Sequence, residues 1–240
     1  MLRRFPRDQT LFYARLDHVI FIHFALPPEQ LRSFIPRKAQ LDTFRGRAYL
    51  SIVALYCHHL TVAPFCIPVF GMQGYFQVNI RTYARYGDKR GVVFISSFVG
   101  SLLAGWFARY ILGLNYFPAA IRLREVPDAE GYISGKVIYG HQLVLRYKAK
   151  VDLSTELSTD SRSLAHFLVE RYHSFRDIGR RLRIMTIAHK PWPLYSAKIL
   201  DIQAHYLKEL GIGVLQNRPS PVLVHYSPGV QSEIKYACSV

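Results

Sequence analysis

Apolar and polar side chains alternate along residues 76–83, which is the two-residue period of a β-strand with two different faces. One face carries Gln77, Asn79, Arg81 and Tyr83, and the other carries Phe76, Val78, Ile80 and Thr82. The polar face has amides, a guanidinium and a phenol but no Lys, Asp or Glu. The pattern therefore leaves two readings: the wall of a cavity, or an exposed face with cross-strand pairs.

Runs of β-branched and aromatic residues fill the first two thirds of the chain, with breaks at Gly, Pro and Asp. Residues 86–91 have the composition of a turn between two antiparallel strands. The expected strand segments are 16–26, 48–62, 74–86, 91–99, 118–126, 131–140 and 141–151. The pattern predicts an α+β fold, mainly of antiparallel strands.

Four segments have helical character: 27–36, 101–113, 158–175 and 197–210. Ser101 is a candidate N-cap of the second, and Thr159 or Ser161 of the third. In the fourth, Ile199, Ile202, Tyr206 and Leu210 form an apolar stripe that predicts a packing face.

The uncharged stretch 91–108 reaches the length of a membrane span. Its first part is β-branched and its second part helical, which favours a buried strand followed by a buried helix. The N-terminal apolar run is short and follows Arg15 and Asp17, so it predicts a strand rather than a signal peptide. We therefore expect no membrane span.

The chain has 240 residues, half of them hydrophobic, which fits a single domain over residues 1–240. The net charge of +15 would attract nucleic acid, anionic lipid or an acidic partner. The basic cluster at 176–184 has no interleaved aromatic residues, so it predicts a solvated face and no specific nucleic-acid partner. A homo-oligomer is compatible with this composition.

Three cysteines, Cys57, Cys66 and Cys238, suggest no disulfide framework. We expect reduced thiols in a cytoplasmic protein. A zinc site from Cys57, His58, His59 and Cys66 is conceivable, but the spacing matches no standard pattern. The prediction is no metal.

Five segments in order resemble motifs of the YqjF-like uncharacterised family in the acetoacetate decarboxylase-like superfamily. They are FIP with LDTFRGRAYLSIVAL (34–55), FQVNIRTYARYGDKRGVVFISSF (76–98), FLVERYHSF (167–175), IAHKPWPLYSA (187–197) and VHYSPGV (224–230). The resemblance implies a cone-shaped β-barrel with helices packed outside. It also implies that the polar face of residues 77–83 points into the barrel mouth, as a first reading of the alternation allows.

Two departures from the family pattern limit the chemistry. The family usually has Glu where this chain has Gln77, and acetoacetate decarboxylase uses a Schiff-base lysine. The corresponding segment here, LNYFPAAIRL (114–123), has no Lys. Schiff-base decarboxylation is therefore not expected, and no cofactor is predicted.

Arg81 is the first candidate for a substrate-binding residue, because a guanidinium can bind a carboxylate or phosphate through two hydrogen bonds. The alternative is a structural arginine that holds a carboxylate or backbone carbonyls. Gln77 and Asn79 would orient the ligand beside it. His189 and Tyr83 are the candidate catalytic residues, His189 because its reference pKa is near neutrality, although a packed histidine is the alternative.

The remaining predicted substrate-binding residues are Arg109, Tyr116, Trp192 and His225. Arg109 is the single charge in a long apolar stretch, so a buried position with Glu170 or a ligand as partner is expected. For Glu170 and Arg171 an anchoring role between helix and barrel is favoured.

These observations favour a pocket for a small anionic organic molecule in a soluble β-barrel protein. The reaction would be a non-Schiff-base lyase or proton-transfer step on a carbonyl acid. A non-catalytic binding protein is the second hypothesis, and a basic protein that docks on nucleic acid or a membrane surface is the third.

Overall fold

The computed structural model describes residues 9–69, 72, 74–110, 116–158, 160–212, 220–235 and 238–240. The long strands are β1 (Thr10–Leu26), β3 (Ala48–Val62), β5 (Gly74–Tyr86), β6 (Lys89–Val99), β9 (Tyr132–Tyr139), β10 (Gln142–Glu156), β12 (Arg181–His189), β13 (Tyr195–Gln203) and β14 (Leu223–Lys235). The shorter ones are β2 (Gln40–Leu41), β4 (Ile67–Pro68), β7 (Tyr116–Pro118), β8 (Ala120–Arg124), β11 (His173–Ile178) and β15 (Cys238–Ser239).

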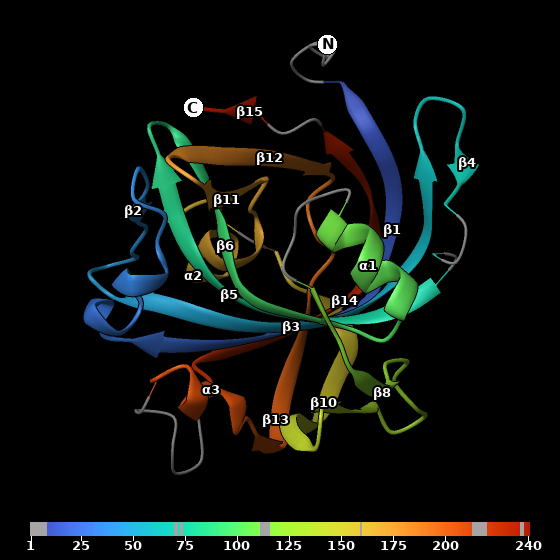
Figure 1. Ribbon diagram of the computed structural model, residues 1–240. Helices are drawn as coiled ribbons and strands as arrows, with labels where there is room; N and C mark the ends of the chain where they lie inside the picture. Colours follow the sequence, from blue (N-terminus) through green and yellow to red (C-terminus); the bar gives the residue numbers. More distant parts are fainter. Residues whose placement is uncertain are drawn as a thin grey trace.

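These strands form one 15-stranded sheet whose main path is β15-β12-β11-β6-β5-β3-β1-β14-β13-β10-β9-β8. Most pairs are antiparallel, and β6 pairs in parallel with β7 and β11. β12 also pairs with β14, so the path from β12 through β11, β6, β5, β3, β1 and β14 returns to its start. In Figure 1, β3 and β1 cross the view, with β11 and β12 above them and β13, β10 and β8 below them. The mainly antiparallel, strand-rich fold agrees with the prediction.

Both faces of β5 are covered, which explains why its alternation does not mark a solvent boundary. The apolar residues Val78 and Ile80 pack with β1, β3, β9 and β10 in one core cluster. The opposite face lies beside a second cluster that includes Phe21, Val53 and Phe167. The β5–β6 hairpin turns at Gly87-Asp88, within the predicted turn, and Gly87 takes the positive φ that this turn requires.

The described helices are short: η1 (Pro28–Gln30), η2 (Arg32–Phe34), α1 (Leu102–Tyr110), α2 (Leu164–Val169) and α3 (Tyr206–Glu209). Two 3-10 turns therefore replace the single helix expected at 27–36. Ser101 caps α1 as predicted, since its Oγ accepts from Ala104 N at 3.2 Å. Residues 111–113, the predicted end of that helix, lie outside the described residues. Within the described part of the chain, no helix is long and apolar enough to cross a membrane.

The helix predicted at 158–175 covers only Leu164–Val169, and its cap is Ser163, whose Oγ accepts from His166 N. Ser161 is therefore not the cap, and Thr159 lies outside the described residues. α2 does not pack on the outside of the sheet as expected. Phe167 contacts the rings of Tyr49 and Tyr83, and Figure 1 shows α2 within the curve of β3 and β5. The helix thereby fills part of the interior.

The helix predicted at 197–210 is wrong over most of its length. Residues Tyr195–Gln203 form β13, which pairs with β10, and only Tyr206–Glu209 is helical. The register skips Leu200, because Lys148 pairs with Asp201 and Ala149 with Ile199. Because of this irregularity, Ile199 and Ile202 lie on the same face of β13 although they are three positions apart, a spacing that is also typical of a helix face.

Candidate functional site

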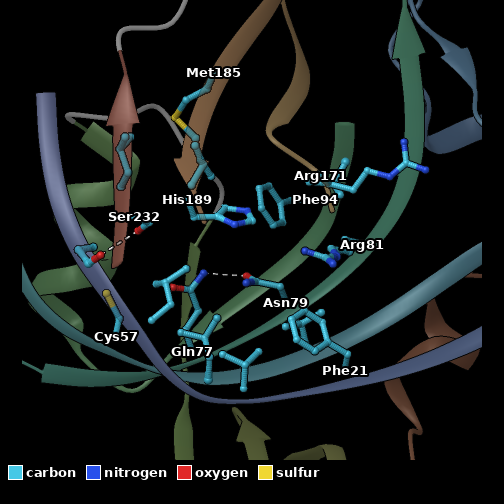
Figure 2. Close-up of a pocket in the computed structure, with 18 of the residues that line it drawn as sticks. Phe21, Cys57, Gln77, Asn79, Arg81, Phe94, Arg171, Met185, His189 and Ser232 are labelled. Carbon is cyan, nitrogen blue, oxygen red and sulfur yellow. Dashed lines mark hydrogen bonds between the residues drawn. The ribbon is translucent and has the colours of Figure 1, made fainter. Parts of the chain in front are cut away.

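The polar face of β5 forms part of the wall of a cavity of about 130 Å³. Gln77, Asn79 and Arg81 line it in succession, and Figure 2 shows their polar groups gathered on one side, with His189 and Phe94 facing them. Gln77 and Asn79 are buried and Arg81 is half-buried. The alternation noted in the sequence therefore places these groups in the interior, and their roles in binding remain predictions.

The rest of the wall is mostly apolar and comes from strands far apart in the sequence. Among the described residues it contains no Asp, Glu or Lys. The other lining residues include Leu16, Phe21, Val53, Cys57, Tyr75, Phe94, Tyr116, Arg171, Met185, His189, Trp192 and Ser232. A small number of polar groups in an apolar wall is typical of small-molecule sites.

The two amides and a phenol form a hydrogen-bonded group at one side of the cavity. Gln77 Nε2 donates to Asn79 Oδ1 at 2.8 Å and to the Tyr116 hydroxyl oxygen at 2.9 Å. Both of its N–H groups are therefore used. Burial raises the pKa of Tyr116, so this phenol stays protonated and can donate a hydrogen bond.

Arg81 has no carboxylate partner among the described residues, and its Nε is buried without any hydrogen-bond partner. Its Nη2 donates to the Leu168 carbonyl at 3.2 Å, and its guanidinium lies 5.7 Å from the centre of the Phe21 ring. A backbone carbonyl and an aromatic ring do not neutralise a guanidinium. The structure thus leaves a cation at the cavity whose hydrogen-bonding capacity is only partly used.

Arg171, which lines the same cavity, has the opposite environment. Its Nη1 donates to Asp42 Oδ2 at 2.7 Å and its Nε to the Phe167 carbonyl at 2.6 Å, and its side chain is 1% exposed. Arg90 approaches the same carboxylate to 3.5 Å. This buried ion pair ties the end of α2 to the segment before β3, in agreement with the anchoring role favoured for Arg171.

His189 stands at the end of β12 and presents its ring to the cavity (Figure 2). Its Nδ1 lies 2.8 Å from the Lys190 carbonyl. Because a carbonyl only accepts, Nδ1 carries the proton, and Nε2 is the acceptor in the neutral ring. Burial lowers the pKa of His189, while the Lys190 carbonyl and the Glu170 carboxylate oppose this and Arg81 adds to it. At pH 7 the ring is therefore mainly neutral, as a general base requires.

Trp192 and Glu170 fix the segment that carries His189. Glu170 Oε1 accepts from Trp192 N at 3.0 Å and its Oε2 accepts from the Tyr172 hydroxyl at 2.6 Å. The His189 ring packs between Tyr172 and Trp192, with centroids at 4.7 and 5.1 Å. His189 and Trp192 also line a second groove, so this segment separates the cavity from that groove.

Tyr83 does not line the cavity, although it shares the face of β5 with Arg81. Its hydroxyl donates to the Leu168 carbonyl at 3.0 Å and lies 2.5 Å from Ser51 Oγ. Ser51 Oγ in turn lies 2.6 Å from His23 Nδ1, and both Tyr83 and His23 are 0% exposed. Tyr83 was predicted to be catalytic, but the structure places it outside the cavity, because α2 covers its side chain.

His225 belongs to this polar group rather than to the cavity. Its ring is 5.9 Å from that of His23, and it lines a different groove on the side of β13 and β14. Burial lowers the pKa of His225 to about 4. It is therefore a neutral, packed histidine at pH 7.

Arg109 is exposed in α1 and is not among the residues that line the cavity. The expectation that it is buried is wrong, because α1 turns this position to solvent. Glu170, its expected partner, bonds instead to Tyr172 and Trp192.

Several cavity residues were missed from the sequence. The sequence favours an anchoring role for Arg171, a reduced thiol for Cys57, and positions within strands for Phe21 and Phe94, and it points to none of the four as a cavity residue. Their positions depend on which strands come together, which alternation alone does not reveal. Burial raises the pKa of Cys57 to about 11, so this thiol is not a ready nucleophile. Within the described residues there is no group of three or more His, Cys, Asp or Glu that could hold a metal ion.

Comparisons with known proteins concern the family of the chain and its fold. The uncharacterized protein YqjF of Bacillus subtilis (strain 168) is 28% identical over 212 residues, which is 88% of this chain and 85% of that protein. The crystal structure of acetoacetate decarboxylase from Legionella pneumophila has a TM-score of 0.66 at 16% identity and covers 100% of this chain and 91% of its own. At this identity, the likeness shows the fold alone.

The enduracididine biosynthesis enzyme MppR with HEPES buffer bound has a TM-score of 0.67 at 12% identity, over 98% of this chain and 89% of its own. MppR has also been solved in complex with pyruvate. A model of the family DUF2071, described as an uncharacterized conserved protein, matches residues 13–231. The chain therefore belongs to the DUF2071 family, and its fold is that of the acetoacetate decarboxylase-like proteins.

Proposed function

We propose that the cavity binds a small organic anion, of the class of carbonyl acids, through Arg81. The observation that carries this proposal is the guanidinium of Arg81, which lines the cavity with a buried, unpartnered Nε and no carboxylate partner among the described residues. A carboxylate would neutralise this charge and accept two parallel hydrogen bonds. The pyruvate complex of MppR, a protein of the same fold, gives this class of ligand further support.

The reaction class that fits these residues is proton transfer next to a carbonyl. His189 Nε2 would take a proton from the carbon beside the carbonyl, and the electron pair of the broken C–H bond would move to form an enolate. The amides of Gln77 and Asn79 and the hydroxyl of Tyr116 would orient the ligand. Trp192 would pack against it and hold His189 in place.

A Schiff-base mechanism is not part of this proposal. None of the nine lysines of the chain lines the cavity, although all nine lie within the described residues. Catalysis through an imine requires a lysine whose amine is activated inside the site.

The return of the strand path to β12 supports a cone-shaped barrel around this cavity. One sheet that holds every described strand supports a single domain. The three free cysteines fit a reducing, cytoplasmic location.

A non-catalytic binding protein is the second candidate, and one observation favours it. Within the described residues, no carboxylic acid lines the cavity, and Gln77 is present where the family resemblance implies a glutamate. Burial raises the pKa values of the cavity phenols Tyr75 and Tyr116, so both keep their protons at neutral pH and neither acts as a proton donor to a base or as a base itself. His189 and His173, which both line the cavity and have pKa values lowered mainly by burial, are then the candidate proton carriers.

Titration calorimetry with pyruvate and with its neutral methyl ester tests the binding proposal. Loss of one partner of a desolvated charge pair costs about 2–5 kcal/mol. We therefore expect Arg81→Met to abolish pyruvate binding, and Arg81→Lys, which keeps the charge but loses the planar fork, to weaken it strongly. The matched control is Arg85→Met, which removes an exposed arginine from the same strand. Unchanged pyruvate affinity in a folded Arg81→Met protein contradicts the proposal.

Deuterium exchange at the methyl group of pyruvate, followed by NMR, separates the two candidates. A proton-transfer enzyme exchanges these protons faster than buffer does, and His189→Gln removes this acceleration without loss of pyruvate affinity. Binding by the wild-type protein with no acceleration supports the non-catalytic binder instead.

A further inference from the structure

The basic cluster at residues 176–184 contains a feature that a solvated face does not explain. It forms the β11–β12 hairpin, in which Arg176 pairs directly with Arg183. Both are half-buried, and no ion pair of either is present among the described residues. Like charges directly opposite each other on neighbouring strands repel, so this pair costs stability unless an anion lies near it.

A pocket of about 250 Å³ adjoins Arg176 where β6 and β11 separate. The parallel pairing of these strands is limited to His173 with Gly91 and Ser174 with Val92. Beyond Ser174 the strands have no further ladder. The pocket lies in this opening, between β6, β11 and the 3-10 turn η2.

Two buried polar atoms at this pocket lack any hydrogen-bond partner. They are Arg176 Nη1 and Ser97 Oγ, and Ser97 is 1% exposed. Burial, and after it the charge of Arg183, lower the pKa of Arg176. Most buried polar groups in proteins have a partner, so two such groups at one pocket indicate a missing ligand.

The acid at the pocket does not fill this role. Asp177 lines it, but its Oδ2 accepts from the backbone N of Arg37 at 3.2 Å and from Arg37 Nε at 3.3 Å. Asp177 is thus already paired with an arginine other than Arg176. The remaining walls are largely apolar, with Phe34, Phe94 and Phe175 among them.

We propose that this pocket is a second anion-binding site, which takes a small organic carboxylate with an apolar body. Arg176 Nη1 and Ser97 Oγ donate to the carboxylate, and the aromatic walls contact the body. Phe94 and Tyr116 line both this pocket and the cavity at Arg81, so they form the partition between the two sites. The site does not depend on the ligand proposed for Arg81.

Benzoate is a suitable probe, with benzamide as its neutral counterpart and inorganic phosphate as an anion without an apolar body. We expect benzoate to raise the melting temperature of the full chain more than benzamide or phosphate does at equal ionic strength. Arg176→Met should lower benzoate affinity about tenfold or more, because a charge-assisted hydrogen bond is lost. Arg162→Met, which removes an arginine whose side chain is 91% exposed, is the matched control and should keep the wild-type response.

Arg81→Met distinguishes this site from the cavity. Retained benzoate binding in Arg81→Met supports a separate site, and loss there with retention in Arg176→Met overturns the proposal. Equal binding of benzamide, or a stronger response to phosphate, also overturns it.

Two measurements keep the test decisive if Arg176→Met does not fold. Ser97→Ala should weaken benzoate binding severalfold. In the wild-type protein, benzoate should slow modification of Arg176 by phenylglyoxal, measured by peptide mass spectrometry, without slowing that of Arg162. Absence of both effects contradicts the site.

Discussion

Arg81 and Arg171 line the same cavity, yet their partners assign them different tasks. Arg171 is held by the Asp42 carboxylate, and both side chains are almost fully buried. Arg81 reaches a backbone carbonyl and an aromatic ring and keeps an unused N–H. One guanidinium is therefore part of the framework, and the other is available to a ligand.

This difference predicts opposite phenotypes for the same substitution. Arg171→Met leaves the buried Asp42 carboxylate with only the more exposed Arg90, whose Nε lies 3.5 Å away, so the free energy of unfolding should fall by about 3 kcal/mol or more. Arg81→Met breaks no ion pair and should change it much less. Chemical denaturation of both variants measures this, and restoration of part of the loss in Asp42→Asn combined with Arg171→Met would confirm that the cost is an unpaired charge. Equal stability losses in the two single variants would contradict the assignment.

His225 makes stability depend on pH. Burial lowers its pKa from 6.5 to about 4, so below pH 6.5 the unfolded chain binds a proton that the folded chain does not. The contribution of His225 to the free energy of unfolding is therefore fully present above pH 6.5 and is lost as the pH drops toward 4. At about 1.4 kcal/mol per pH unit, His225 accounts for a loss of up to about 3 kcal/mol.

Unfolding free energies at several pH values check this expectation. His225→Gln has no ionisable group, so its stability should fall less steeply between pH 6.5 and 4 than that of the wild type. Parallel curves for the two proteins would mean that His225 ionises as easily in the folded state as in the unfolded chain.

The strand period of two put Gln77, Asn79 and Arg81 on one face, and the family resemblance implied that this face points inward. The sequence could not exclude Tyr83, which obeys the same period. What separates Tyr83 from Arg81 is α2. The Leu168 carbonyl of this helix accepts from both side chains, although Leu168 lies 85 positions after Tyr83 and 87 positions after Arg81 in the sequence. Alternation predicts a direction from the backbone, and it does not predict what lies in that direction.

At the scale of elements, β13 shows how a local irregularity misleads. Tyr195, Ala197 and Ile199 are half-buried and alternate with exposed residues, as in a strand. The skipped Leu200 then shifts the phase, so Ile202 follows Ile199 by three positions. With a short helix directly after the strand, the apolar spacing resembled one long helix.

Gly91 allows β11 to approach β6 beside the proposed second site. A Cβ on Gly91 would lie 2.4 Å from the His173 carbonyl oxygen, which belongs to the backbone and cannot easily move aside. We expect Gly91→Ala to lower the free energy of unfolding by about 1–3 kcal/mol, as overpacking does. Gly100→Ala is the control, because its Cβ would meet its nearest neighbour at an ordinary 3.6 Å. Thermal melts that rank the two variants the other way round would show that the β6–β11 contact is not tight.

At the scale of the whole molecule, the charge balance explains why unpaired arginines occur inside the fold. The chain has 31 basic and 16 acidic residues, so many cations have no acidic residue to pair with. Asp42 serves Arg171 and Arg90, and Asp177 serves Arg37. Arg81 and Arg176 remain without a carboxylate among the described residues, and both line pockets. The sequence alone gives no reason for the basic composition, and the two unpaired arginines make it consistent with the binding of anions in the interior.

The distribution of lysines over the molecule predicts the outcome of a trapping experiment. Eight of the nine lysines are exposed, Lys235 is half-buried, and none lines the cavity at Arg81. An imine with a carbonyl acid forms readily where a lysine is desolvated or lies next to another cation in the same site as the bound ligand.

We therefore expect that treatment with acetoacetate and borohydride yields no stoichiometric covalent adduct in the intact mass spectrum, even at acetoacetate concentrations that raise the melting temperature of the protein. Adduct levels should match those of Arg81→Met, since any remaining reaction occurs at exposed lysines outside the cavity. A single adduct of the mass of a reduced acetoacetate imine, formed by the wild-type protein and not by Arg81→Met, would show that a lysine reaches the bound ligand and would return this chain to Schiff-base chemistry.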